Sequence, residues 1–238
     1  MNSAGNDDTT TPGVETEPAN LEAGVVTLVE GATFCVSGRS GDIDPGSPQG
    51  LFFRDTRILA RWRLDVAGRT PQELTVIPGE PYEATFLARV RPGLSQTELL
   101  VERRRLVGQG MREDLCLRNM SARTVSTTVS VTVGADFANL FDVKETRVRT
   151  GAEVSTAANG DTLRFSPRRG IGSPVVSVRA DGAVADGGGL RFRLTLAPRS
   201  EWSTSIHVVP SLDGEPVPAA FPVDHPVGES RPARRMQT

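Results

Sequence analysis

Alternating apolar and polar side chains run through most of this chain and limit what it can fold into. A period of two sends successive side chains to opposite faces of an extended strand, so one face of each strand can be buried. Between Val125 and Val133, valines alternate with serine and threonine. The same period appears in other stretches: 58–66, 82–90, 190–196 and 202–208, and, more briefly, 25–29, 33–36, 74–77, 99–106, 115–118, 143–149, 162–165 and 175–178.

Turn-forming residues separate these stretches. Asn159-Gly160 is the strongest hairpin signal, because both residues tolerate the positive φ of a type I′ turn. A single helical turn is expected at residues 136–141, and no longer stretch has the period of an amphipathic helix. Many short strands without intervening helices predict an all-β fold, a large antiparallel β-sandwich. No linker interrupts the pattern, so we expect one domain.

The two ends of the chain differ from this middle part. Residues 1–22 are polar and acidic with almost no large apolar side chains, which is typical of a disordered leader. Residues 211–238 are rich in proline and show no periodicity, which indicates a linker or tail. The predicted β-domain therefore spans residues 23–210.

Composition excludes several functions. With 27 Lys and Arg against 29 Asp and Glu, the net charge is −2, so neither a nucleic acid nor an anionic membrane is an expected partner. No secretory signal or membrane-spanning stretch is present in the sequence, and we expect a cytoplasmic location. Cys35 and Cys116 fit either a disulfide or, as a reducing compartment favours, two buried thiols.

Catalytic and cofactor motifs are scarce. His207 lies on the polar side of a strand and His225 in the proline-rich tail, and neither has evident partners for a nucleophile or zinc site. Residues 41–46 lack the third acidic ligand and closing Glu of a calcium loop, and are interpreted as a solvated loop. Residues 103–105 are consecutive arginines on a strand, interpreted as ordinary surface charge. We expect no catalytic residue, metal or cofactor.

Two stretches are candidates for binding or docking. The first contains Phe52, Phe53, Asp55 and Arg57. If residues 55 and 57 lie on one strand, their side chains share a face and can form an ion pair, with Asp55 capping the turn.

The second stretch directly follows the clearest strand and contains Asp136, Phe137, Phe141 and Asp142. Its apolar residues can anchor a one-turn corner with the aspartates at its edges. Three interpretations remain open: a structural corner, a contact to a partner domain or glycan, or a pair of catalytic acids. The last requires carboxylates about 5–9 Å apart, which spacing in a sequence does not establish.

These stretches carry a resemblance to a known family. The first stretch and the residues before it resemble the opening of the N-terminal domain of bacterial glycogen-debranching enzymes of the amylo-α-1,6-glucosidase type. The resemblance rests on residues 34–36, the loop 38–42, Gly50-Leu51-Phe52, Asp55-Thr56-Arg57, Leu59 and Trp62. Later blocks of that domain are similar to three further parts of this sequence: Arg103 with Arg105, residues 117–121 and residues 135–143. One departure is Asn139, where an acidic residue is expected. The similarity runs in order from about residue 25 to about residue 210.

The resemblance implies a β-supersandwich that precedes a helical (α/α)6 barrel, whose carboxylates cleave the glycosidic bond. No helical repeats follow within this sequence, so no catalytic residue carries over. The chain is then a free-standing relative of the accessory domain, a partner of a separately encoded catalytic part, or a fragment. We therefore expect a non-catalytic domain associated with α-glucan debranching, which docks on a glycosidase barrel or contacts glycan. If it docks, Phe52, Phe53, Phe137 or Phe141 are the expected partly exposed anchors. The alternatives are an orphan structural module, or a small glycosidase using Asp136, Asp142 or Asp55.

Overall fold

The structure is a computed structural model that describes residues 24–91, 98–145, 154–168 and 174–222. Strands and one short helix make up its regular structure, in this order: β1 (Val25–Glu30), β2 (Thr33–Gly38), β3 (Gly50–Phe53), β4 (Thr56–Leu59), β5 (Arg61–Val66), β6 (Gln72–Pro78), β7 (Glu83–Val90), β8 (Leu99–Val107), β9 (Met111–Asn119), β10 (Val125–Gly134), α1 (Leu140–Lys144), β11 (Val154–Asn159), β12 (Thr162–Pro167), β13 (Val175–Ala180), β14 (Val184–Asp186), β15 (Gly189–Leu196), β16 (Glu201–Leu212) and β17 (Glu215–Pro216).

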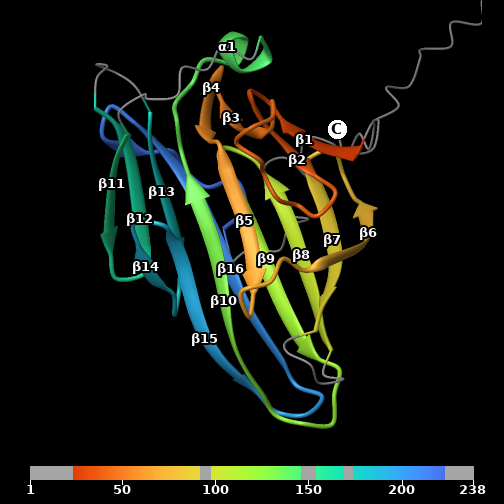
Figure 1. The fold of residues 1–238 in the computed structure, drawn as a ribbon. Helices are drawn as coiled ribbons and strands as arrows, with labels where there is room; N and C mark the ends of the chain where they lie inside the picture. Colours follow the sequence, from red (N-terminus) through yellow and green to blue (C-terminus); the bar gives the residue numbers. More distant parts are fainter. Residues whose placement is uncertain (1–23, 92–97, 146–153, 169–173, 223–238) are drawn as a thin grey trace, which may run out of the picture.

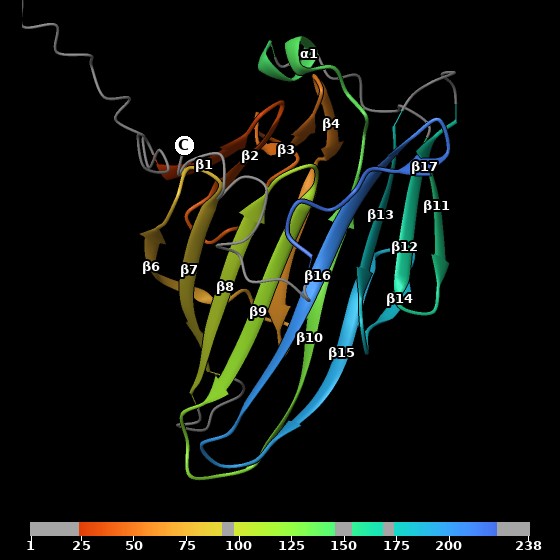
Figure 2. The same cartoon turned by 180° about the vertical axis from the view of Figure 1, so that it is seen from behind.

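The strands form antiparallel sheets in two layers. One layer is a nine-stranded sheet in the order β11-β12-β13-β16-β9-β8-β7-β6, with β17 paired to β16. The other layer consists of two four-stranded sheets, β14-β15-β10-β5 and β1-β2-β3-β4. Figures 1 and 2 show β5, β10 and β15 on one side of the molecule and the long strands β7, β8, β9 and β16 on the other. The all-β sandwich expected from the alternation is confirmed.

The alternation locates most strands well but misplaces two boundaries. The stretch 58–66 divides into β4 and β5 at Ala60, whose amide donates instead to the carbonyl of Gly134. The predicted helical turn at 136–141 forms later in the chain, as α1, which also replaces the start of the strand expected at 143–149; residues 146–149 lie outside the described residues. The Asn159-Gly160 turn joins β11 to β12 as predicted, with Gly160 at φ +60°.

The packed part of the chain continues beyond residue 210. The expected boundary falls inside β16, and the segment after β17 returns to the sandwich, where the ring of Phe221 lies 5.2 Å from the ring of Tyr82. Phe221 is buried against Tyr82 and Leu106 because this contact removes its apolar ring from water. Residues 1–22, the expected leader, lie outside the described residues.

The most unusual feature of the core is a cluster of buried charges. Arg103 and Arg105 project from β8 between the layers, and neither is more than 2% exposed. The Nε atom of Arg103 donates to Glu113 Oε1 at 3.0 Å, and that of Arg105 to Glu113 Oε2 at 2.9 Å. Trp62 of β5 donates its indole N–H to the same carboxylate at 3.1 Å. One acidic side chain of β9 thus joins both layers.

The same arginines hold the loop between β2 and β3. Arg103 donates to Asp42 Oδ1 at 2.6 Å and to the carbonyl of Ser40, and both arginines donate to the carbonyl of Gly41. Gly41 has φ +83°, and a Cβ there would lie 3.1 Å from the Phe86 ring. Two sequence interpretations were therefore wrong: Arg103 and Arg105 are core residues rather than surface charge, and this part of the loop is clamped rather than solvated.

Among the described residues, the helical segment is too short to cross a membrane.

We expect Glu113→Gln to destabilise the fold by about 3–5 kcal/mol, because two buried guanidinium groups lose a shared carboxylate and only Arg103 keeps a charged partner, Asp42. Burial alone would raise the pKa of Glu113, but Arg103 and Arg105 outweigh it and hold the pKa below its ordinary 4.5. The network therefore contributes fully above pH 4.5, and this stability is lost as the pH falls through the lowered folded-state value. Urea unfolding at pH 7 and across an acid series measures both effects.

The matched control is Glu201→Gln, which removes an exposed ion pair with Arg118 and should change stability by less than about 1 kcal/mol. Equal unfolding midpoints for Glu113→Gln and the parent chain would contradict the assignment.

Candidate functional site

The sequence-predicted site residues gather at one end of the sandwich. We call this region the corner: the β3–β4 hairpin, residues 50–59, together with residues 134–145, which include α1. Figure 1 shows α1 capping this end above β3 and β4. The two stretches are joined through the backbone, because Arg57 N donates to Ala138 O and Leu140 N donates to Asp55 O. The structure therefore brings together the two stretches that the sequence singled out separately.

Phe52 and Phe53 hold the corner from inside. Phe53 is 4% exposed and belongs to the main core, whereas Phe52 is 1% exposed and stacks on Phe34 with ring centroids 4.5 Å apart. Adjacent residues of a strand point to opposite faces, so Phe52 and Phe53 pack in different surroundings. The register of β3 against β4 also shifts between Leu51 and Phe52. The burial of Phe52 and Phe53 does not fit the expectation that they are partly exposed anchors.

Arg57 pairs with Asp136 and not with Asp55. Asp55 lies in the turn before β4 with φ +60°, so it does not share a strand face with Arg57. The guanidinium of Arg57, 2% exposed, donates from Nε to Asp136 Oδ1 at 3.2 Å and from Nη2 to Asp136 Oδ2. The expected Asp55–Arg57 ion pair is replaced by a contact that spans 79 residues of sequence.

Arg57 also fixes the loop that leads into β3. Its Nη1 atom donates to the carbonyls of Gln49, at 3.0 Å, and Ser47, at 3.3 Å. Gly50 permits this close approach, since a Cβ at that position would lie 2.5 Å from Arg57 Cδ and 3.0 Å from the carbonyl oxygen of Leu59. Arg57 thus connects three segments of the corner.

The second stretch turns sharply into α1. Asp136 Oδ1 accepts from the amide of Ala138, and Phe137, half-buried against the core, has φ +51°. Asn139 then caps α1, its Oδ1 accepting from Phe141 N at 2.9 Å. Asn is among the best N-cap residues, so Asn139 has a structural role at the position where the family resemblance led us to expect an acid.

Phe141 is the exposed aromatic of the corner. It is 67% exposed on α1, whereas Val143 on the same helix is 4% exposed. Asp142 lies beside it, also exposed, in the first turn. Of the four phenylalanines predicted as anchors, only Phe141 and the half-buried Phe137 offer surface to a partner.

The three aspartates of the corner that the sequence offered as catalytic acids are not brought together in one site. The carboxylate of Asp136 is occupied by Arg57 and the Ala138 amide, and Asp55 and Asp142 are exposed to water. In the described ranges, no group of three or more His, Cys, Asp or Glu side chains is placed to hold a metal ion. Cys35 and Cys116 are both free thiols, and burial raises the pKa of each.

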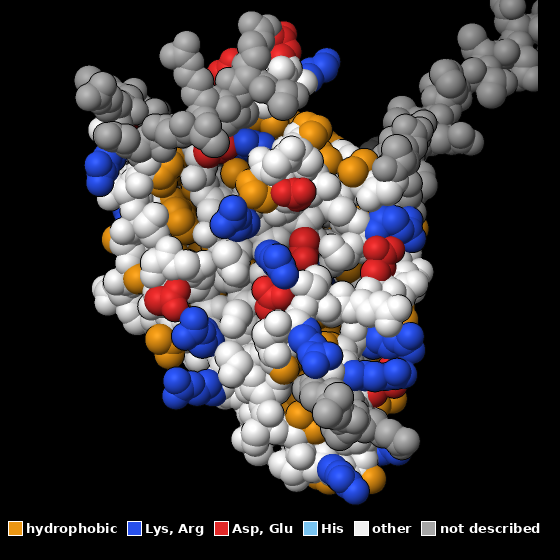
Figure 3. Space-filling model, viewed as in Figure 1, with side chains coloured by type: hydrophobic (Ala, Val, Ile, Leu, Met, Phe, Trp, Pro, Cys, Tyr) orange, Lys and Arg blue, Asp and Glu red, His pale blue; other side chains and the backbone are white. Residues whose placement is uncertain are grey.

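Two open hollows are lined by residues outside the corner, and sequence reasoning missed both. One, of about 730 Å³, lies beside the loop 38–49 and β5. Around it the basic and acidic side chains are interspersed, as Figure 3 shows for this face of the molecule. The other, of about 880 Å³, lies on the outer face of the nine-stranded sheet and includes His207. The polar residues at the outward positions of β16 were the available signal, but a single strand does not show what its neighbours place beside it.

Replacing Asp136 by Asn should destabilise the chain by about 1–3 kcal/mol, because a buried arginine keeps its charge and loses its charged acceptor. Asp142→Asn changes the net charge equally on the exposed surface of α1 and should shift stability by no more than about 0.5 kcal/mol. Urea unfolding of both variants measures the difference, and equal stabilities would show that the Arg57–Asp136 contact does not hold the corner.

Several solved structures are similar to this one at low sequence identity. A candidate kojibiose phosphorylase from the human microbiome has a TM-score of 0.47 and 7% identity over 83% of this chain, which spans 30% of that protein. A galactose mutarotase-like protein from Clostridium acetobutylicum has a TM-score of 0.46 and 7% identity over 79% of this chain and 95% of its own. The 4-α-glucanotransferase from Thermococcus litoralis has a TM-score of 0.42 and 8% identity, with 82% and 39% covered.

No curated protein matches the sequence. The family model for the N-terminal domain of (some) glycogen debranching enzymes matches residues 28–207, which include most of both layers of the sandwich and the whole corner. The match covers well over half of the chain and agrees with the resemblance carried by the corner residues. The chain therefore belongs to the family of N-terminal domains of glycogen debranching enzymes.

Proposed function

We propose that this chain is a non-catalytic domain of α-glucan debranching, and that its corner docks on the catalytic barrel of a glycosidase. Family membership supports the first part, because the family is defined by a domain of debranching enzymes. The exposed ring of Phe141 is the observation that carries the second part.

Phe141 is exposed, but the segment that carries it is held in place by several contacts. Asn139 caps its helix, Val143 anchors the helix to the body, and Arg57 and Asp136 clamp the segment before it. An aromatic side chain held on such a support loses little freedom when it enters a pocket of a partner, and aromatic residues dominate the energetics of interfaces. A corner with this construction suits docking.

The surroundings of Phe141 resemble the rim of an interface. Arg54, Asp55, Asp142 and Lys144 are exposed charges of both signs on the hairpin and α1. A central apolar anchor with polar groups around it is the usual organisation of non-obligate protein interfaces. We infer that these groups set the orientation of the partner while Phe141 supplies most of the affinity.

The glycosidase alternative has less support from the geometry. A general acid must hold and release a proton, but Asp136 is bonded to a buried arginine. Asp55 and Asp142 lie on an exposed turn and an exposed helix rather than in a cleft.

Docking is tested by titrating the chain into the isolated catalytic barrel of a glycogen debranching enzyme of the same family, after circular dichroism shows that the barrel is folded. We expect a dissociation constant below ~100 μM. Phe141→Ser should weaken binding by at least ~10-fold, since burial of an aromatic hot spot contributes about 2 kcal/mol or more.

Val184→Ser is the matched control, because Val184 is also 67% exposed but lies on β14, away from the corner. It should bind like the parent chain. Absence of binding at ~100 μM, or equal weakening by both variants, would contradict docking through the corner and favour an orphan module.

A further inference from the structure

The larger hollow lies on the outer face of the nine-stranded sheet, far in sequence from the corner residues. It has a volume of about 880 Å³, within the range of about 300–1,000 Å³ that small-molecule sites occupy. Strands β9, β12, β13 and β16 and the turn after β13 form its floor, and its polar side chains include Asp114, Arg179, Asp181, Ser203, Ser205 and His207.

Strand register aligns polar side chains across this floor. Arg179 of β13 is opposite His207 of β16, and His207 is opposite Arg112 of β9. The neighbouring position of β16, Ser205, is opposite Asp114 of β9. Because opposite residues of antiparallel strands have adjacent side chains, the sheet presents imidazole, guanidinium, carboxylate and hydroxyl groups side by side.

Each charge of this network has an oppositely charged partner, although its three aspartates outnumber its two arginines by one. Asp114 Oδ1 accepts from Arg112 Nε at 2.7 Å and from Ser205 Oγ at 2.6 Å. Arg179 donates to Asp161 at 3.1 Å and to Asp181 at 2.7 Å. A floor whose arginines are already paired with carboxylates offers little net attraction to an ion. It suits a neutral ligand with many hydroxyl groups.

On the outward side of β16, the imidazole of His207 and the hydroxyl of Ser203 line the hollow without a hydrogen-bond partner in the described part of the chain. Burial, aided by Arg112, lowers the pKa of His207, so the imidazole is neutral near pH 7 and has one donor and one acceptor nitrogen. A sugar hydroxyl both donates and accepts a hydrogen bond, as these two groups require.

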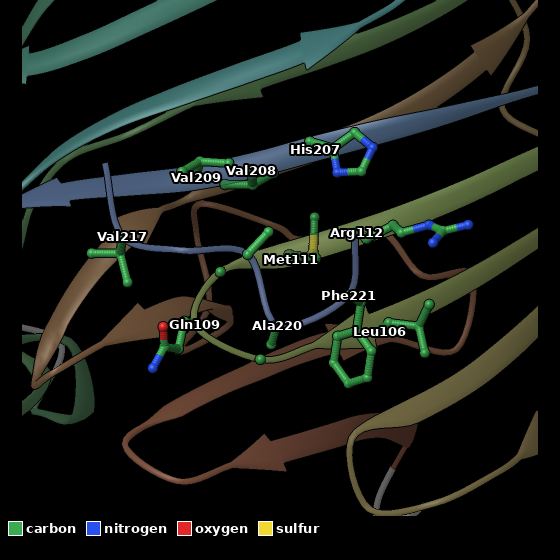
Figure 4. A pocket seen from close by; sticks show the side chains of 13 residues that line it. Leu106, Gln109, Met111, Arg112, His207, Val208, Val209, Val217, Ala220 and Phe221 are labelled. Carbon is green, nitrogen blue, oxygen red and sulfur yellow. The ribbon is translucent and has the colours of Figure 1, made fainter. Parts of the chain in front are cut away.

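The C-terminal segment bounds this network on one side. Arg112 Nη1 donates to the carbonyl of Pro222 at 3.1 Å, and Phe221 packs nearby. Figure 4 shows His207 and Arg112 on neighbouring strands beside Phe221. The cavity there, which His207 also lines, has a volume of only about 20 Å³, enough for about one water molecule. The room for a ligand therefore lies on the other side of His207, over β13 and β16.

We propose that this hollow binds a neutral oligosaccharide, specifically an α-1,4-linked glucan chain, with His207 and Ser203 bonding its hydroxyl groups. The choice of glucan rests on the proposed function, whereas the neutral, hydroxyl-rich class of ligand rests on the floor itself. The hollow beside β5 is a weaker candidate, because Arg63, Asp65 and Thr70 there are bonded to one another and Asp42 is bonded to Arg103.

The test is a titration of the ¹⁵N-labelled full chain with maltoheptaose, followed by NMR. We expect saturable shifts confined to the amides of residues 112–114, 177–181 and 203–209, with a dissociation constant at or below ~1 mM. His207→Ala and Ser203→Ala should each weaken binding by ~3–10-fold, as loss of one hydrogen bond to a neutral partner does.

The matched control is Glu201→Ala, on the same face of β16 but outside the lining residues, and it should bind like the parent chain. Phe141→Ser should also bind maltoheptaose normally, so failure of barrel docking and failure of this site are distinguishable. No saturable shifts up to ~10 mM, shifts centred on the other hollow, or binding unaffected by both His207→Ala and Ser203→Ala would overturn the proposal.

Discussion

The carboxylate of Glu113, shared by two buried arginines, is the interaction on which the rest of the structure depends. Two guanidinium groups between apolar layers are very costly unless every charge has a partner. One carboxylate balances one of them, and Asp42 supplies the second negative charge. Asp42 reaches this position only if the loop after β2 folds back over the core. The need of the buried arginines for charged partners therefore determines the path of the loop between β2 and β3, which has no regular structure of its own.

The corner repeats this solution on a smaller scale. Arg57 is buried, takes one carboxylate from a distant segment and fills its remaining donors with carbonyls of the loop at 47–49. The loop between β2 and β3 is thus held by Arg103 and Arg105 at its start and by Arg57 at its end. Because β3 and β4 carry the turn against which α1 is placed, the same clamps support the exposed ring of Phe141. A firm support of this kind suits an accessory domain whose contacts lie on its surface.

The sequence was sufficient for the class of fold because alternation is a local property. Strand β10 and the β11–β12 hairpin could be recognised from a few adjacent residues. The break at Ala60 could not, since its amide bonds to Gly134, far away in the sequence. The Arg57–Asp136 pair could not be predicted for the same reason. The spacing of Asp55 and Arg57 led to a wrong prediction of an ion pair, because Asp55 lies in a turn and not on a strand. The family resemblance pointed to the corner residues without showing which of them touch.

Arg103 and Arg105 were misinterpreted although a signal was present. Val101, Arg103, Arg105 and Val107 share one parity along β8, as Met111, Glu113, Leu115 and Leu117 do along β9. The alternation thus placed three charges on the core side, but the expectation that arginine stays at the surface overrode the pattern. His207 was set aside on similar grounds, since a histidine between serines shows no evident site until the side chains of β9 and β13 are placed beside it.

Native-state hydrogen exchange of the loop between β2 and β3 tests the central claim most directly. The buried arginines hold this loop, in which the amides of Gly38 and Gly41 donate to loop carbonyls and the amide of Ile43 donates to Trp62 O of β5. If those charges fix the loop to the core, these amides should exchange only through global unfolding, with protection comparable to that of the amides of β8 and β9. Rapid exchange of the loop amides while β8 and β9 stay protected would contradict the account.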